Sequence, residues 1–216
     1  MEPPTIVRRS ETMLGWHFLA TDRRLRYGNQ EVEAGQTYTA AGPLAMCRNG
    51  MHACRRPLDA LDYAPGPIVC RVQLVGEISH DRDKSVARSR RVLWLADATT
   101  VLHEFTLSVA TTALSIVEAH GGTVDPRSWK ALEVKAIWLR GKATDQQLTA
   151  ARAAAWAAAG ADAWAAARAA AGDAAWATAR ATAGDAAGAA ARAAAWAAAR
   201  AAYNVQLETM LDALKG

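Results

Sequence analysis

The stretch PIVCRVQLVGEISHDRDKSVARSRRVLWLA, residues 67–96, decides the fold of the first half of the chain. Its first part, residues 67–79, is rich in β-branched side chains and nearly alternates, which is typical of a strand. Residues 85–96 form a second strand candidate, polar at the start and apolar at the end. We therefore expect both segments to be strands of one small sheet.

Upstream of this stretch the chain also has short, β-like segments. Residues 14–20 (LGWHFLA) are a strand candidate, and residues 31–40 resemble two half-strands. Asn49-Gly50 is the strongest hairpin signal in the chain, because this pair readily adopts the positive φ angles of a tight turn. Residues 57–64 open with a proline, which suits the first position of a helix. This half is expected to be an α+β unit with a mostly antiparallel sheet.

From Asp97 the apolar period changes from two to about 3.6, which predicts helices. The first helix has one apolar stripe, formed by Leu102, Phe105, Val109, Ala113, Ile116 and Val117. A second helix is expected to begin with Asp125 as its N-cap and Pro126 at its first position, and to end at Gly141. A third begins at Thr144, where Thr-Asp-Gln-Gln forms a capping box.

Residues 149–202 are rich in alanine, and most other side chains there fall on a four-residue lattice. On one straight helix each four-residue step turns the lattice by about 40°, so the tryptophans and arginines would not share one face. Short helices broken at Gly172-Asp173 and Gly184-Asp185 are one interpretation, and one long wrapped helix is the other. Six side chains are candidates for cation–π or base stacking: Trp164, Arg168, Trp176, Arg180, Trp196 and Arg200. Alternatively, tryptophan is the core residue among alanines and arginine keeps the outside soluble.

The predicted fold class is α+β, a small mostly antiparallel sheet domain followed by an all-α, alanine-rich helical repeat region. The expected parts are a flexible arm (residues 1–12), a small α+β domain (13–97), two connecting amphipathic helices (98–143) and an Ala/Trp/Arg repeat region that closes with an amphipathic helix (144–216).

Composition limits the location and the partners. The 216-residue chain carries a formal charge of +4, which permits an anionic partner without requiring one. Its three cysteines argue for a reducing compartment rather than a disulfide framework. The start, MEPPTIVRRSETM, has prolines and charges where a signal peptide is apolar, and charges interrupt the alanine tract. We expect no signal peptide, no membrane span and a cytoplasmic location, the host cytoplasm if a phage encodes the chain.

One cluster of residues has the chemistry of a metal site. Cys47, His52, Cys54 and Cys70 include the ligand types of a tetrahedral zinc site, but the spacing C-x4-H-x-C is unusual for one. Buried free cysteines and a turn histidine explain the same residues. His52 is also the candidate catalytic residue, although no third group orients a Cys–His pair. We expect no cofactor, and His17 has no metal-like spacing.

The densest basic run is a candidate for contact with an anion or a nucleic acid. It consists of Lys84, Arg88, Arg90 and Arg91. On a strand Arg88 and Arg90 share one face and Arg91 takes the other. A solvated strand edge that discourages aggregation is the alternative interpretation. The sequence has no phosphate-binding loop, dinucleotide fingerprint, zinc-protease motif or nucleophile elbow.

Residues 14–95 share a set of short motifs with a known group of proteins. The motifs are Gly15-Trp16 with Phe18, Gly35 with Tyr38, the turn with Cys47, Gly50, His52 and Cys54, Pro57-Leu58-Asp59, Tyr63, Gly76-Glu77 and Asp83-Lys84-Ser85. With them the segment resembles an uncharacterised domain that recurs in phage and prophage proteins. Residues 138–159 and those that follow resemble Ala/Trp/Arg helical repeats of phage and actinobacterial proteins, some described as putative immunity proteins. These resemblances imply an accessory protein of a mobile genetic element.

A second resemblance concerns Gly50, His52, Tyr63 and the strand Val69 to Val75. In this order they are similar to parts of the ADP-ribosyltransferase-like and RNA 2′-phosphotransferase-like folds, which implies a transferase using His52. The chain departs from that pattern because no catalytic Glu and no second essential Arg or His can be matched.

The function expected from the sequence is that of a non-enzymatic interaction protein of a phage or mobile element. It would bind a host protein or protein complex, could thereby antagonise a host defence system, and would self-associate through its alanine-rich helices. Two alternatives stay open: the transferase centred on His52, and a basic nucleic-acid-binding protein. The sequence does not name the partner or fix the oligomeric state.

Overall fold

A computed structural model describes residues 11–26, 29–119, 121–157 and 184–215, with the backbone alone for residues 184–196. The chain divides into two compact units. Unit 1 combines Met1–Val101 with Asn204–Gly216, and unit 2 is Leu102–Tyr203. The last turns of the chain therefore belong to the same unit as the sheet, whereas the sequence groups them with the alanine-rich region.

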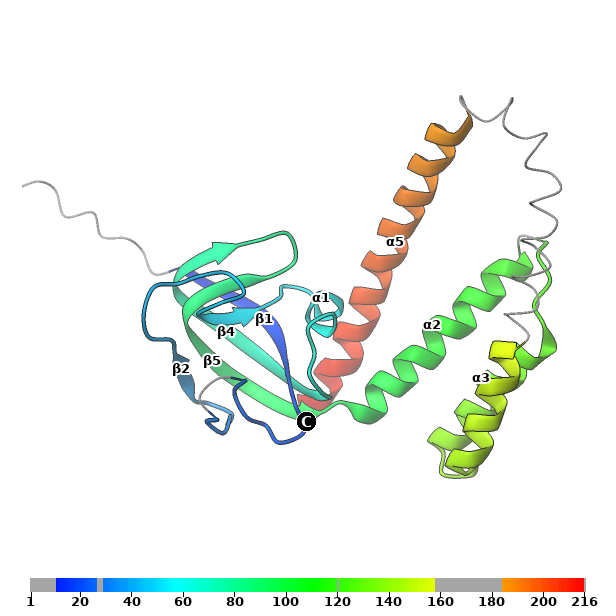
Figure 1. The fold of residues 1–216 in the computed structure, drawn as a ribbon, viewed down its shortest axis with the longest axis horizontal. Helices are drawn as coiled ribbons and strands as arrows, with labels where there is room; N and C mark the ends of the chain where they lie inside the picture. Colours follow the sequence, from blue (N-terminus) through cyan, green and yellow to red (C-terminus); the bar gives the residue numbers. More distant parts are fainter. Residues whose placement is uncertain (1–10, 27–28, 120, 158–183, 216) are drawn as a thin grey trace, which may run out of the picture. The chain divides into compact units, whose positions relative to one another are not determined.

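Unit 1 contains an antiparallel five-stranded sheet, which confirms the α+β class (Figure 1). The strands follow the order β1-β4-β5-β2, and β3 also pairs with β5. Their bounds are β1 Glu11–Leu19, β2 Thr37–Thr39, β3 Met51–Ala53, β4 Ile68–His80 and β5 Ser85–Asp97. The two strands expected within residues 67–96 are thus confirmed, and they are the long central pair of the sheet.

A single bridge closes the sheet on itself. The Trp16 amide of β1 donates to the Cys54 carbonyl at 2.7 Å, and the Cys54 amide donates to the Trp16 carbonyl at 3.0 Å. Because Cys54 directly follows β3, the pairing runs β1-β4-β5-β3 and returns to β1, a ring that we call the barrel. Register shifts in the β4–β5 pairing, one of them beside Gly76 at φ +100°, allow these long strands to bend.

The strands have two buried faces. Inside the barrel lies a cluster of buried side chains: Met13, Leu19, Val32, Tyr38, Ala53, Ile68, Cys70, Val72, Leu74, Ala87 and Val92. Trp16 and Phe18 alternate with Met13 and Leu19 along β1, so they occupy the opposite face, and they are fully buried too. The outer face of the sheet is therefore also covered.

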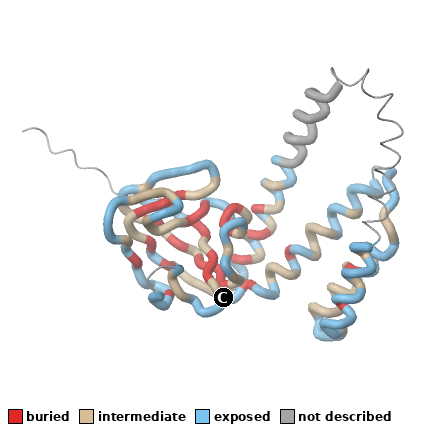
Figure 2. The backbone as a smooth tube through the Cα atoms, in the orientation of Figure 1, coloured by how far each residue is buried: buried red, intermediate tan, exposed pale blue. Residues whose placement is uncertain are grey.

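Two segments far apart in the sequence cover the outer face, and buried residues are found in both (Figure 2). The short helix α1 (Pro57–Leu61) begins with proline as expected, and its Leu58 amide donates to the Asn204 side chain at 3.1 Å. Asn204 lies in α5 (Gly184–Asp212), whose end bears the fully buried Leu207 and Leu211. The 3-10 turn Ala213–Lys215 contacts β5. These last turns therefore complete the core of unit 1.

The hairpin expected at Asn49-Gly50 is wrong by three residues. Ala45 pairs with Asn49, so the chain reverses at residues 46–48, with Cys47 at φ +62°. The side-chain Nδ2 of Asn49 donates to the carbonyls of Ala41 and Pro43, at 2.7 and 2.8 Å, and thus holds the preceding loop. Gly50 is needed for another reason, because a Cβ there would collide with Val86.

In unit 2 the helix boundaries follow the local capping signals. Helix α2 is Thr99–Ala119, and α3 is Pro126–Leu139. Asp125 caps α3 by accepting from the Arg127 amide at 2.8 Å. The helix at residues 145–157 begins with the expected capping box, since Thr144 and Gln147 exchange amide-to-side-chain hydrogen bonds of 2.8 and 3.2 Å.

Indole-to-carboxylate hydrogen bonds join the helices of unit 2. Trp129 Nε1 donates to Glu118 at 2.9 Å, and Trp138 Nε1 donates to Asp145 at 2.7 Å. Among the described residues of this unit, the buried hydrophobic side chains are Phe105, Ala131 and Leu148. In the part of unit 2 that the structure describes, polar bonds between helices thus accompany a small apolar core.

Helix α2 is more exposed than its apolar stripe predicts. Phe105 is buried, whereas Ile116 and Val117 are 51% and 43% exposed. In the described part of the chain α2 is also the one helix whose length and mean hydropathy of 1.3 would suffice to cross a membrane. Only 6% of that stretch is buried, and length and composition alone do not establish a span.

Most of the alanine tract, including Gly172-Asp173, lies outside the described residues, so the structure does not test whether the tract is one helix or several. The backbone of α5 is helical from Gly184 through Asp185 to Asp212 without interruption. Asp185 therefore lies within this helix rather than ahead of it.

The buried end of α5 yields a stability prediction. Leu207→Ala should lower the free energy of unfolding of unit 1 by about 2–5 kcal/mol, because it removes a fully buried side chain and leaves a cavity. Val205→Ala, at a neighbouring but 66% exposed position, should change it by no more than about 0.5 kcal/mol. Urea unfolding followed by circular dichroism measures both, and equal effects would contradict the assignment of these turns to unit 1.

Candidate functional site

The side chains with the most chemical potential gather where the turn at residues 46–48 meets the β4–β5 connection. We call Cys47, His52, Tyr63, Asp83 and Lys84 the turn cluster. His52 Nε2 accepts a hydrogen bond from the Cys47 amide at 3.0 Å, and its Nδ1 lies 3.1 Å from the Gly50 carbonyl. This pair of contacts requires the neutral ring with its proton on Nδ1. Both ring nitrogens therefore hold the turn.

The surroundings of His52 oppose its protonation. Burial lowers the pKa of the ring, and the positive charges of Arg90 and Lys84 lower it further, while the bond to the Gly50 carbonyl acts in the opposite direction. A proton on Nε2 would also face the Cys47 N–H. To act as a general base, His52 would have to release the turn that it holds.

The other part of the cluster is a chain of polar contacts. Tyr63 donates to Asp83 Oδ2 at 2.8 Å, and Lys84 Nζ lies 3.4 Å from the Tyr63 hydroxyl and 4.4 Å from the centre of its ring. The hydrogen bond to Asp83 raises the pKa of Tyr63. Contacts with Cys47 and Tyr63 raise the pKa of Lys84, so its ammonium group stays charged. The arrangement connects α1, the turn and the β4–β5 connection.

The three cysteines lie in different environments. Cys54 and Cys70 are buried, and burial raises the pKa of each thiol to about 12, whereas Cys47 is exposed. Within the described residues no group of three His, Cys, Asp or Glu side chains could hold a metal ion. Cys47 and His52 do meet, but through the amide of Cys47 rather than its thiol.

The basic run does not form one surface. Lys84 belongs to the turn cluster, and Arg88 donates to the carbonyls of Ala40 and Gly42, which fixes the loop after β2. Arg90 is buried inside the barrel, and Arg91, on the opposite face of β5, is exposed. The strand alternation expected for these arginines is thus present, but their environments differ.

Arg90 has a neighbour that the sequence did not single out. His17 lies on β1, opposite Cys70 of β4, and burial together with the charges of Arg90 and His52 holds its pKa well below the ordinary value. The two-residue period of β1 places His17 on the same face as Met13 and Leu19. That period was the available signal for an interior histidine.

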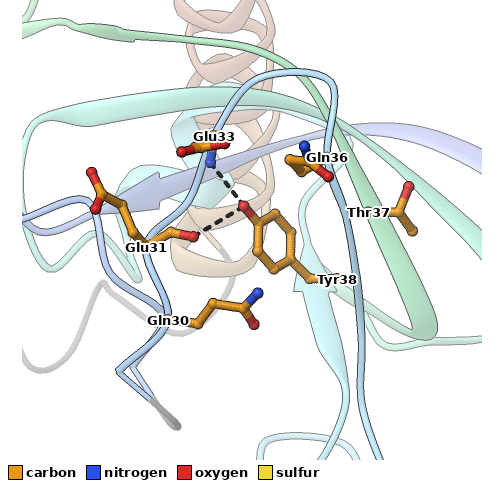
Figure 3. Close-up of a pocket in the computed structure, with 6 residues that line it drawn as sticks. All are labelled: Gln30, Glu31, Glu33, Gln36, Thr37 and Tyr38. Atoms are coloured by element: carbon orange, nitrogen blue, oxygen red, sulfur yellow. Dashed lines mark hydrogen bonds between the residues drawn. The ribbon is translucent and has the colours of Figure 1, made fainter.

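A shallow pocket of about 260 Å³ lies beside β2 (Figure 3). It is lined by Gln30, Glu31, Glu33, Gln36, Thr37 and Tyr38. The Tyr38 hydroxyl accepts from the Glu33 amide at 2.8 Å and donates to the Glu31 carbonyl at 3.0 Å. This tyrosine therefore fixes the loop, and the hollow has acidic walls without a positive group among its lining residues.

The candidate stacking residues are largely beyond the part that the structure describes. Trp164, Arg168, Trp176 and Arg180 fall outside it, and of Trp196 the backbone alone is described. Arg200 is partly buried on α5. Their stacking role stays a prediction.

Comparison with known proteins finds a match for the sheet domain alone. Residues 13–104 match the family model of a domain of unknown function, DUF7666. Neither a curated protein nor a solved structure matches the chain. The match covers the small domain expected from the motifs in residues 14–95.

The role of His52 in the turn predicts how stability depends on pH. Since its pKa is lowered in the folded chain, the unfolded chain binds the proton more readily, and folding loses stability as the pH falls below about 6.5 toward that lowered pKa. The stability advantage of the wild type over His52→Gln should therefore shrink between pH 7.5 and pH 5 in urea unfolding. Asn49→Ala weakens the same loop but keeps His52. The difference in unfolding free energy between the wild type and this variant should therefore be independent of pH.

The cysteine environments predict selective labelling. In the native protein a maleimide should add once, at Cys47, because Cys54 and Cys70 are buried and protonated. Intact-mass spectrometry should show one adduct in the wild type, none in Cys47→Ala and three after unfolding of the wild type. Rapid labelling of native Cys47→Ala would contradict the burial of the other two thiols.

Proposed function

We propose that the chain is a non-enzymatic interaction protein that binds another protein through the exposed apolar face of α2. The carrying observation is that this 21-residue helix has one buried side chain, Phe105, among the described residues. Ile116 and Val117 are exposed on its surface. A contiguous exposed apolar surface is typical of a site that binds a partner.

The charge of α2 favours a protein over a nucleic acid. The helix contains no Lys or Arg, and its charged residues are Glu104 and Glu118. A nucleic-acid site needs cations that neutralise phosphates. A partner with an apolar contacting surface fits this face better.

The state of the candidate catalytic groups also favours binding over catalysis. Both ring nitrogens of His52 are engaged with the backbone, and Cys54 and Cys70 are buried thiols. The tyrosine of the turn cluster donates to Asp83 and contacts the lysine. A transferase centred on His52 would have to break the turn first.

The proposal also includes the kind of organism that encodes the chain, its partner and its self-association. The resemblance of residues 14–95 to a phage and prophage domain supports a mobile-element protein whose partner is a host protein or protein complex, in the host cytoplasm, with a component of a defence system as the specific candidate. The alanine-rich composition of residues 149–202 supports self-association, because small side chains allow helices to approach closely. Light scattering of the purified chain tests the second point.

A charge placed on the exposed face of α2 tests the proposal. Partners captured from a bacterial lysate would be purified and their affinity measured by calorimetry. Ile116→Lys with Val117→Lys should weaken binding at least tenfold, because an ammonium group would be buried in an apolar contact. Ser115→Lys adds the same charge at an exposed polar position of the same helix and should bind like the wild type.

Two results would contradict the proposal. One is unchanged affinity of the double variant with an unchanged melting temperature. The other is flotation of the wild type, but not of the double variant, with phosphatidylcholine vesicles, since α2 would then bind lipid. If NAD stabilises the wild type and the His52→Ala variant loses this stabilisation, the transferase alternative is supported instead.

A further inference from the structure

Arg90 is a buried cation inside the barrel. The residue is 2% exposed, and its Nη1 donates to the His52 carbonyl at 2.8 Å. Its Nε has no hydrogen-bond partner, and no carboxylate of the described residues forms an ion pair with it. A buried guanidinium normally has a carboxylate or phosphate beside it, because its transfer from water is costly.

Each of the other four strands contributes one titratable side chain to the surroundings of Arg90. They are His17 of β1, Tyr38 of β2, His52 of β3 and Cys70 of β4. Tyr38 faces Arg90 directly, since the two residues are paired in the sheet. None of the four is a carboxylate, and the ring of His52 belongs to the turn cluster, so Arg90 meets only the backbone carbonyl of that residue.

None of these neighbours can supply the missing negative charge at neutral pH. Burial raises the pKa of Cys70 to about 12, so its thiol stays protonated. The Tyr38 hydroxyl donates a hydrogen bond to the Glu31 carbonyl. Burial lowers the pKa of Arg90 to about 10, which still leaves the guanidinium charged at pH 7. Arg23 adds a further positive charge near Cys70.

We propose that the barrel interior beside Arg90 binds a small oxyanion, the phosphate or carboxylate group of a small ligand. The edge of the guanidinium that carries the unpartnered Nε–H is the donor, because this edge matches the two oxygens of such a group. His17 lies near Arg90 in the barrel, and its side chain is half-buried. This site is independent of the protein-binding face on α2.

The proposal predicts a specific response to inorganic phosphate. At constant ionic strength, phosphate at about ten times its Kd should raise the melting temperature of the wild type by about 3 °C, since it binds the folded chain alone. Arg90→Met should lose this response. Arg91→Met removes the exposed arginine next in sequence and should keep it, so it controls for general attraction to a basic chain. Acetate in place of phosphate distinguishes a carboxylate site from a phosphate site.

His17 provides a second measurement, which does not depend on whether Arg90→Met folds. An anion beside Arg90 offsets the charge that lowers the pKa of His17, so phosphate should raise that pKa in the wild type, as followed by NMR. His103, whose pKa is lowered in the helical unit by burial and by Lys135 and Arg152, should not respond. A His17 pKa that is unchanged by phosphate and acetate, or an equal thermal response of Arg90→Met and Arg91→Met, overturns the proposal.

Discussion

The bridge between Trp16 and Cys54 is the constraint on which the sheet unit depends. Without these two backbone hydrogen bonds, β1 would be one free edge of a twisted sheet, and β2 and β3 together would form the other. With them, the strands form a ring and each strand has an interior and an exterior face. This closure sends His17 and Arg90 inward and Trp16 outward, and it creates two apolar surfaces. The second surface then requires a cover that the strands cannot provide.

That cover joins distant parts of the sequence. The Arg71 guanidinium lies 4.5 Å from the centre of the Trp16 ring and 3.7 Å from Glu208, so the outer face of the sheet contacts the last turns of α5. Leu207 and Leu211 contribute most of the buried apolar area of this contact. The partly exposed Arg71–Glu208 ion pair adds little to its stability. The first hundred residues thus bury their outer face only when the C-terminal turns are present. The alanine-rich region is an insertion between two segments of one unit.

The sequence predicts features whose causes are local. Asp125 and Thr144 cap helices through hydrogen bonds within three residues, so the short-range pattern is sufficient there. The turn near Asn49 was predicted at the wrong residues, because the side-chain amide of Asn49 bonds to carbonyls six and eight residues earlier. A dipeptide preference does not include such contacts. Strand alternation separated Arg90 from Arg91, but the burial of Arg90 depends on the closure of the barrel. No local pattern shows that closure, so the interior site was beyond prediction.

Arg90 is where local and global requirements conflict most clearly. Its position in the strand opposes Tyr38 and Leu74, and an apolar side chain there would fill the barrel without the cost of a buried charge. The hydrogen bond to the His52 carbonyl satisfies one N–H group only, and a neutral donor could make it. Residues that break the packing rules of their surroundings without compensation are expected at functional sites. The barrel therefore has in its interior the property that a ligand site requires, whereas the turn cluster has its polar groups matched to one another.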